Sequence, residues 1–463
     1  MEEIMKKILS IALVALLVAS TAFAGFSGKA KLSLGYDTES ESYGFKNGQD
    51  FSVDLDVASE TAEAAGEGEV FAGVKATLSL KAADITAEDV KKANAYIFVK
   101  DGVAEEGLGL ILSLKEAYVA GQDWKVSITG TQKGPDFAKS AIDYVFDDYG
   151  KDAFGNKLEV WYNENYKAKS YAVSVNKAPG VTATYKDWSV AAGFNGGKAS
   201  AKTLAPDFFN YHVSAISPEV AVAEGISVKI GAVASGIKNA TEYNEALKKN
   251  LYKEDKNFDA FGVSAQVAYA AEAFSAKVAG DFGMKKTVGT DDFKADFDVA
   301  ANVAYAPVAV DVYFSRVKEV NYLSAQVSGA YEGISGKIYA QDILEENKDV
   351  TIGADAEYTV DAVKVGAGFW MTTDSKKMEV SGNVEYAAEK FTAKAGAVYG
   401  TQIDIEDSSY LRLNASVESS AIIPGATISL GYGPNTDGAT GKKTTNLLKE
   451  KYGSVKAQCV IAF

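Results

Sequence analysis

One pattern recurs five times in the second half of the chain: alternating apolar and polar residues end in a tyrosine, turn within a few residues, and alternate again. The tyrosines are Tyr269, Tyr305, Tyr331, Tyr358 and Tyr386, and the first apolar residues after the turns are Phe274, Val308, Ile334, Val363 and Phe391. Strict alternation predicts strands with one apolar and one polar face, and short turns predict antiparallel hairpins. Tyrosines on the apolar face, always at the same hairpin end, are typical of a membrane interface. We therefore expect a sheet whose apolar face meets lipid and whose five tyrosines form an aromatic girdle.

The first 24 residues have the pattern of an export signal. Lys6 and Lys7 precede an apolar run, and small residues surround the expected cleavage point at Ala24. An N-terminal membrane anchor is the rival interpretation, but the apolar run is too short to span and no stop-transfer pattern follows. Residues 1–24 are thus predicted to be a cleaved signal peptide.

The rest of the chain, residues 25–463, is predicted to be one closed barrel. After the leader, no segment approaches the roughly 20 consecutive apolar residues that a membrane helix needs, and a closed barrel is the other structure that satisfies its own backbone in lipid. The mean hydropathy of -0.07 and the low count of seven prolines suit such a chain. The expected fold class is all-β, a large transmembrane antiparallel up-and-down β-barrel. At about ten residues per strand plus connections, it has roughly 16 to 24 strands, and we favour about 20 to 22.

The connections also alternate in length. Tight turns such as Ala306-Pro307 alternate with longer polar segments such as 342–349 and 433–452. In outer-membrane barrels the short turns are periplasmic and the long loops extracellular, which would place the tyrosine girdle on the periplasmic side. Residues 239–258 carry many charges and are expected to form a helical surface loop.

The polar face of the predicted strands carries many charges. A barrel of 16 or more strands is wide enough for an aqueous channel, and burying so many charges in a packed core would be prohibitive. We expect the following residues to line a water-filled pore: Lys277, Asp281, Lys294, Asp296, Asp298, Asp311, Lys337, Asp355, Glu357, Lys364, Glu379, Glu385, Lys394 and Arg412.

Two motifs resemble those of known outer-membrane barrels. The last strand alternates to a terminal aromatic, Phe463, which resembles the sorting signal that the barrel-assembly machinery of that family recognises. The run Gly134-Pro135-Asp136-Phe137 resembles the acidic turn in the constriction loop of general porins. Residues 132–167 are therefore a candidate constriction loop or insert, with candidate acidic residues Asp136, Asp143, Asp147, Asp148 and Asp152. An exposed surface loop is the alternative, as is a separate domain between residues 82 and 167 with a smaller barrel around it.

The chain resembles the bacterial porin and major outer-membrane protein families in four features: the N-terminal leader, the alternation of apolar and polar residues, the alternation of short and long connections, and the C-terminal aromatic residue. That resemblance implies an outer-membrane channel for passive diffusion of small hydrophilic solutes or ions, surrounded by lipid and often a homotrimer. The formal net charge of -15 favours a mild cation preference, although loop solvation or divalent bridging to lipopolysaccharide explains it equally well.

Other functions fit the composition less well. With His212 as the one histidine and Cys459 as the one cysteine, the chain offers no zinc site and little for catalysis, so we expect no enzyme, no cofactor and no nucleic-acid partner. A structural or adhesive surface barrel, whose long loops bind host or matrix, is the main alternative function. A soluble secreted β-sandwich or surface-layer protein is a third.

Overall fold

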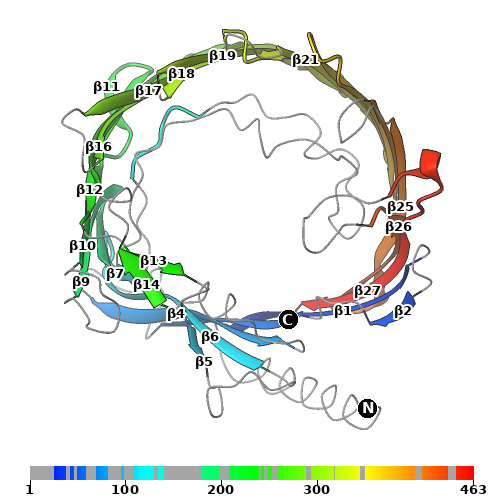
Figure 1. The fold of residues 1–463 in the computed structure, drawn as a ribbon, viewed down its shortest axis with the longest axis horizontal. Helices are drawn as coiled ribbons and strands as arrows, with labels where there is room; N and C mark the ends of the chain where they lie inside the picture. Colours follow the sequence, from blue (N-terminus) through cyan, green and yellow to red (C-terminus); the bar gives the residue numbers. More distant parts are fainter. Residues whose placement is uncertain are drawn as a thin grey trace.

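The computed structural model forms a ring of antiparallel strands (Figure 1). It describes residues 26–37, 42–45, 50–58, 69–81, 95–97, 109–129, 134–139, 180–197, 208–238, 241–244, 249–252, 258–287, 293–317, 319–344, 350–401, 409–435 and 445–462. In this part of the chain the main sheet has 25 strands, of which β2, β5 and β11 each pair with one neighbour only. The remaining 22 strands make the ring.

Each ring strand pairs antiparallel with its two neighbours in the ring. In ring order the first half consists of β1 (Phe26–Asp37), β3 (Asp50–Ala58), β4 (Phe71–Lys81), β6 (Gly109–Ala120), β7 (Trp124–Thr129), β8 (Gly180–Tyr185), β9 (Trp188–Gly197), β10 (Phe208–Ile216), β12 (Ile226–Lys238), β15 (Phe258–Ala270) and β16 (Phe274–Thr287). The second half consists of β17 (Lys294–Tyr305), β18 (Val308–Val317), β19 (Val320–Tyr331), β20 (Ile334–Gln341), β21 (Thr351–Val360), β22 (Val363–Thr372), β23 (Met378–Ala387), β24 (Thr392–Thr401), β25 (Tyr410–Ile423), β26 (Ala426–Gly433) and β27 (Ser454–Ala462).

The ring closes between its first and last strands. β1 pairs antiparallel with β27 from Lys29↔Ala462 to Asp37↔Ser454, so no ring strand in the described residues has a free edge. Three short strands pair locally with ring strands: β2 (Ser42–Phe45) with β1, β5 (Ala95–Ile97) with β6, and β11 (Val220–Ala223) with β12. The predicted fold class, an antiparallel up-and-down barrel of 20 to 22 strands, is confirmed, as are the five tyrosine-ended hairpins from β15–β16 to β23–β24.

No helix among the described residues combines the length and the apolar composition needed to cross a membrane.

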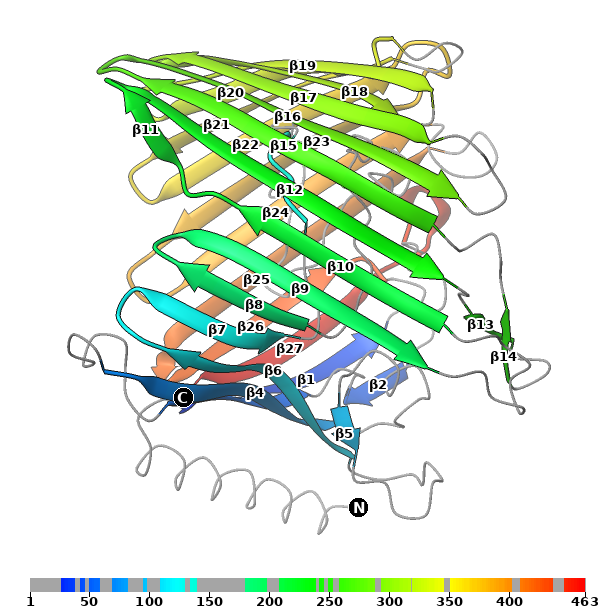
Figure 2. The ribbon, with the colours of Figure 1, turned by 90° about the vertical axis from the view of Figure 1, so that its left-hand side faces the viewer.

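The two ends of the barrel differ in their connections (Figure 2). At one end, here called the short-turn end, two-residue turns such as Lys186-Asp187 and Glu332-Gly333 join the strands, and the chain also begins β1 and ends β27 there. Both residues of each turn have positive φ, 43° and 68° in the first and 47° and 82° in the second, which matches the right-handed strand twist. A Cβ at Gly333 would also lie 2.5 Å from the carbonyl oxygen of Thr359, so this turn requires glycine.

The described part of residues 239–258 is extended and does not form the expected helix. Instead, β13 (Thr241–Asn244) and β14 (Lys249–Tyr252) pair as a separate two-stranded hairpin with Thr241 opposite Tyr252. Thr and Tyr favour extended backbone, and the lysine and glutamate spacing that suggested a helix is equally compatible with a hairpin. Elsewhere in the described residues, the helical element is the single 3-10 turn η3 (Leu447–Lys449).

The two faces of the wall have opposite polarity. Valines that alternate along β17 and β18, such as Val299, Val303 and Val310, are 37–44% exposed on the outer face. The residues between them, among them Asp298, Asp311 and Ser315, are buried on the inner face. Residues 134–139 lie inside the ring, beside the inner face of β12 and β16 (Figure 1).

Aromatic rings on the inner face lie over glycines of the next strand. Tyr118 faces Gly73, Tyr339 faces Gly353 and Tyr410 faces Gly400 across the sheet. A Cβ built on any of these glycines would fall 2.3–2.4 Å from the tyrosine ring. Glycine at these positions therefore lets the ring lie flat on the wall, a pairing that restores packing where a strand lacks a side chain.

Candidate functional site

The charged residues expected to line a pore all lie at inward-facing positions of the strands, but they fall into two groups by burial. The first group is exposed or half-buried and consists of Lys277, Lys294, Asp296, Lys337, Asp355, Glu357, Lys364, Glu385 and Lys394. The second group is buried and consists of Asp281, Asp298, Asp311, Glu379 and Arg412. Only the first group is open to the space inside the barrel. The side chains of the second group are covered by other groups of the protein, so they do not face the open space directly.

Two buried aspartates on neighbouring strands are held by wall side chains. Asp311 accepts hydrogen bonds from Asn302 Nδ2 at 2.6 Å and from Gln326 Nε2 at 3.4 Å. Asp298 accepts a hydrogen bond from the Tyr313 hydroxyl at 2.8 Å. These donors replace part of the hydration that the carboxylates lose on burial.

A second buried cluster lies on β22, β23 and β25. Glu379 accepts hydrogen bonds from Trp370 Nε1 at 3.3 Å and from the Tyr410 hydroxyl. The guanidinium carbon of Arg412 lies 4.4 Å from the centre of the Tyr410 ring, and Arg412 Nε donates to the carbonyl oxygen of Thr445 at 2.7 Å. Arg412 therefore anchors the connection between β26 and β27, which explains its burial.

The open group includes ion pairs along the short-turn half of the inner wall. Lys364 Nζ lies 2.7 Å from Glu357 Oε2, and Lys394 Nζ lies 3.4 Å from Glu385 Oε2. Paired charges of both signs at a half-exposed wall are what a hydrated interior accommodates.

Further inner-wall charges in the first half of the barrel were missed by the sequence analysis. Lys125 Nζ lies 2.6 Å from Glu116 Oε1 and 4.3 Å from the centre of the Tyr118 ring, and Ser127 Oγ donates to Glu116 Oε1 at 2.6 Å. The alternation Trp124, Val126, Ile128 on the outer face could have identified Lys125 and Ser127 as inward. Glu116 was harder to find, because a register shift in the β4–β6 pair between Lys75 and Ala76 interrupts the alternation.

Of the candidate constriction-loop residues, Asp136 is described and lies in the segment inside the barrel. Asp143, Asp147, Asp148 and Asp152 lie outside the described residues, as do residues 1–24 and Phe463. Asp281 of the inner wall accepts hydrogen bonds from the backbone amides of Phe137 and Ala138, so one predicted pore residue contacts the candidate loop directly.

The five tyrosines that end the hairpins are exposed on the outer face at the short-turn end. Their exposed fractions range from 38% for Tyr269 to 65% for Tyr331. Tyr269 and Tyr386 each pair with the aromatic residue after the turn, with ring centres 5.9 Å apart in both Tyr269–Phe274 and Tyr386–Phe391. Exposed rings at the same end of five hairpins are the arrangement that a membrane interface favours.

His212 is on the inner face of β10 and 1% exposed, between Gly193 and Ser235 of the neighbouring strands. The described residues contain no group of three His, Cys, Asp or Glu side chains placed to hold a metal ion.

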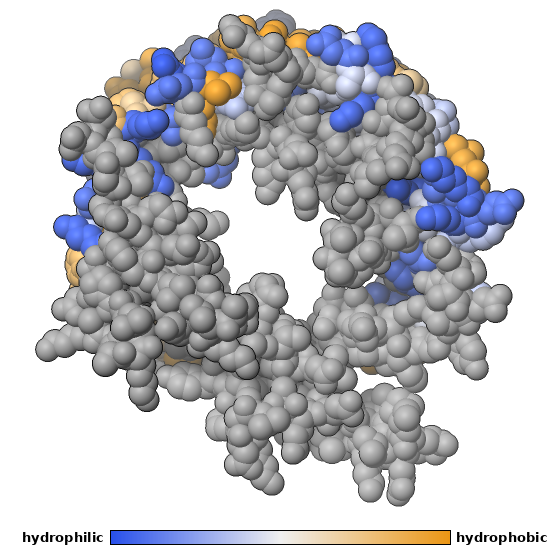
Figure 3. Space-filling model, in the orientation of Figure 1, coloured by the Kyte–Doolittle hydropathy of each residue, from blue (hydrophilic) through white to orange (hydrophobic). Residues whose placement is uncertain are grey.

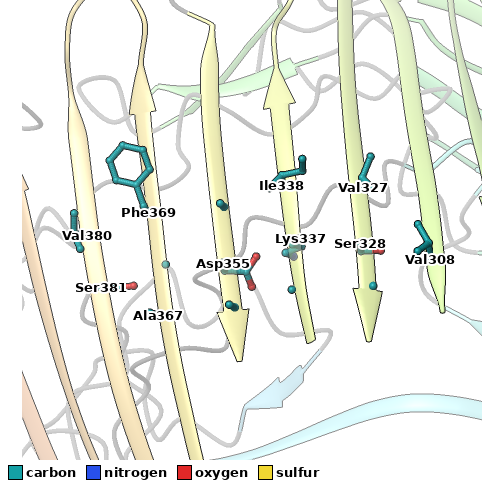
Figure 4. Close-up of a pocket in the computed structure, with 15 residues that line it drawn as sticks. Val308, Val327, Ser328, Lys337, Ile338, Asp355, Ala367, Phe369, Val380 and Ser381 are labelled. Carbon is teal, nitrogen blue, oxygen red and sulfur yellow. The ribbon is translucent and has the colours of Figure 1, made fainter. Parts of the chain in front are cut away.

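A shallow hollow of about 670 Å³ runs along the outer face of the wall from β18 to β23 (Figure 4). Small residues such as Gly329, Gly336 and Ala354 form its floor, and Ile338 and Phe369 rise beside them. It is an open, mainly apolar hollow of the outer wall. In the view along the barrel axis, hydrophobic and hydrophilic residues of the described strands both lie along the upper rim of the ring (Figure 3).

Comparisons with known proteins give likeness at the level of structure. No protein-family model matches the chain, and no curated protein matches it. Among solved structures, the ferric-catecholate import receptor Fiu of E. coli covers 95% of this chain and 82% of its own, at 9% identity and a TM-score of 0.44. A ferric enterobactin receptor of Pseudomonas aeruginosa covers 96% and 81% at 7% identity and a TM-score of 0.47. A Rh. blastica porin mutant covers 59% and 100% at 9% identity and a TM-score of 0.31.

Proposed function

We propose that this protein is an outer-membrane pore that admits small hydrophilic solutes or ions by passive diffusion. The observation that carries the proposal is the opposite polarity of the two wall faces in a closed ring of 22 strands. Exposed valines on the outer face fit hydrocarbon, while half-exposed ion pairs such as Lys364–Glu357 on the inner face fit water. A ring of this size is wide enough for an aqueous channel or for a channel narrowed by a plug.

Planar-bilayer recording of the purified, detergent-folded protein tests this function. We expect unitary current steps, together with uptake of small sugars by liposomes that contain the protein. A protein that inserts and resists extraction but gives neither current steps nor sugar uptake would contradict the pore, and would favour a structural or adhesive barrel whose loops bind host or matrix.

We further propose a mild cation preference, supported by the formal net charge of -15. In a salt gradient, the zero-current potential should then have the sign of cation flow, and the preference should weaken as salt screens the charges. A potential of the opposite sign would remove this part of the proposal.

Three features of biogenesis belong to the same proposal. The N-terminal pattern supports the removal of residues 1–24 on export, and the terminal aromatic supports recognition of Phe463 by the barrel-assembly machinery. The porin resemblance supports assembly of the mature barrel as a homotrimer in lipid.

A further inference from the structure

A row of small and acidic residues forms a seat on the inner wall. Cross-strand register places Gly231, Ser264, Asp281, Asp298 and Ser315 in one row across β12, β15, β16, β17 and β18. All five are buried, and the four with side chains are at most 5% exposed. The Tyr313 hydroxyl covers Asp298 from the wall itself. Residues as short as the others in the row do not cover one another, so their burial requires further cover from inside the barrel.

Part of that cover is the chain's own segment Gly134–Lys139. The backbone amide of Ala138 donates to Asp281 Oδ2 at 2.7 Å, and the amide of Phe137 donates to both carboxylate oxygens at 3.0 and 3.1 Å. A Cβ at Gly231 would lie 2.6 Å from Pro135 Cβ, so the segment contacts the wall backbone directly. Lys229 Nζ lies 5.2 Å from the centre of the Phe137 ring, which adds a cation–π contact.

The hydrogen bonds between Asp281 and the segment are of a kind that holds a backbone firmly in place. A carboxylate that accepts two backbone amides makes short, charge-assisted hydrogen bonds, and the same bonds satisfy amides that the segment cannot pair within itself. The two partners are 143–144 residues apart in sequence, so the contact fixes a point of the long β7–β8 connection to the wall.

We infer that Asp281 is the residue that holds segment 134–139 against the inner wall, and that this contact sets the largest solute that passes. The inference rests on the proposed pore. It names one wall residue as a determinant of solute size, with Lys229 and Gly231 as positioning residues.

Replacing the anchor tests the inference. Asp281→Asn keeps the shape of the side chain but turns one acceptor into a donor that opposes the backbone amides. The matched control is Asp311→Asn, which changes another buried inner-wall aspartate whose hydrogen bonds go to Asn302 and Gln326 of the wall. We expect Asp281→Asn to give larger unitary currents and to lose discrimination between a disaccharide and a tetrasaccharide in liposome uptake. Asp311→Asn should keep both properties of the parent protein.

A reversible cross-link provides the second measurement. In a Cys459→Ser background, Gly231→Cys with Pro135→Cys places the two Cβ atoms close enough to form a disulfide after a small shift. Added to Asp281→Asn, the oxidised bridge should restore the small currents and the size discrimination, and reduction should remove them again.

The outcomes separate the inference from the function on which it rests. If the parent protein conducts, and Asp281→Asn has the currents and sugar selectivity of Asp311→Asn with the bridge oxidised or reduced, Asp281 is not the anchor and the pore remains. If the folded parent protein gives no current and no uptake, the pore itself fails.

Discussion

The outer and inner faces of the same strands differ in which side chains they accept and in what those side chains contact. On β17 and β18, Val299, Val303 and Val312 are 37–44% exposed on the outer face, whereas Asp298 and Asp311 on the other face are at most 6% exposed and hydrogen-bonded. In the proposed membrane location the outer face needs only to be apolar, because lipid accepts any apolar shape. The inner face needs specific partners for each side chain, because several of its polar groups are covered by protein.

A lysine placed on the outer face should have the largest effect. Ile338 is 61% exposed on the outer face in the middle of β20, next to the inward Lys337. Adjacent residues of a strand point to opposite faces. The inner face already carries a lysine at position 337, whereas Ile338→Lys would place the same charge on the outer face, in lipid. We expect a loss of about 2–4 kcal/mol in the free energy of unfolding from lipid vesicles, measured by urea titration.

The control for this substitution is Lys337→Gln, which removes a charge from the inner face of the same strand. It should change stability far less than Ile338→Lys. Equal effects of the two changes would mean that the faces do not differ in environment.

Packing on the inner face gives an intermediate effect. Gly353→Ala would place a Cβ 2.3 Å from Cζ of the buried Tyr339, so the ring must move or the strand must shift. Overpacking of this kind costs about 1–3 kcal/mol. The matched control is Gly382→Ala on the outer face, where the nearest atom would be 3.8 Å away and little change is expected. Urea titration of both variants decides the point, and a Gly353→Ala protein as stable as Gly382→Ala would show that the tyrosine–glycine contact is not tight.

The smallest expected effect comes from the open ion pairs. Lys364 and Glu357 are partly hydrated, with side chains 42% and 18% exposed, so a double-mutant cycle with Lys364→Gln and Glu357→Gln should give a coupling of about 1 kcal/mol or less. A coupling several times larger would indicate that this part of the inner wall is dry, and would make the two faces less different than proposed.

Much of the barrel could be predicted from alternation alone. The period of two separates inward from outward residues without any tertiary information, so β15 to β24 and the strand ends at the tyrosines followed from local sequence. The strand number followed from chain length, because each strand and connection uses a similar number of residues.

The burial of inner-wall side chains by segments that are distant in sequence could not be predicted in the same way. The burial of Asp281 depends on a segment 143–144 residues away, and that of Arg412 depends on Thr445 in the connection before β27. Alternation shows which face a side chain takes, but not what lies on that face. The hairpin at residues 241–252 was also missed, because a short, highly charged segment has no apolar period that distinguishes helix from strand.

Site-directed nitroxide labelling along β17 tests the opposite environments of the two faces most directly. In a Cys459→Ser background and lipid vesicles, single cysteines at positions 296 to 303 would each carry a label, and collision rates would be measured with oxygen, which concentrates in lipid, and with a water-soluble nickel chelate. We predict a period of two, with oxygen favoured at Phe297, Val299, Ala301 and Val303 and lower oxygen contact at the positions between them. Collision rates without alternation, or with oxygen favoured on the aspartate face, would contradict the account.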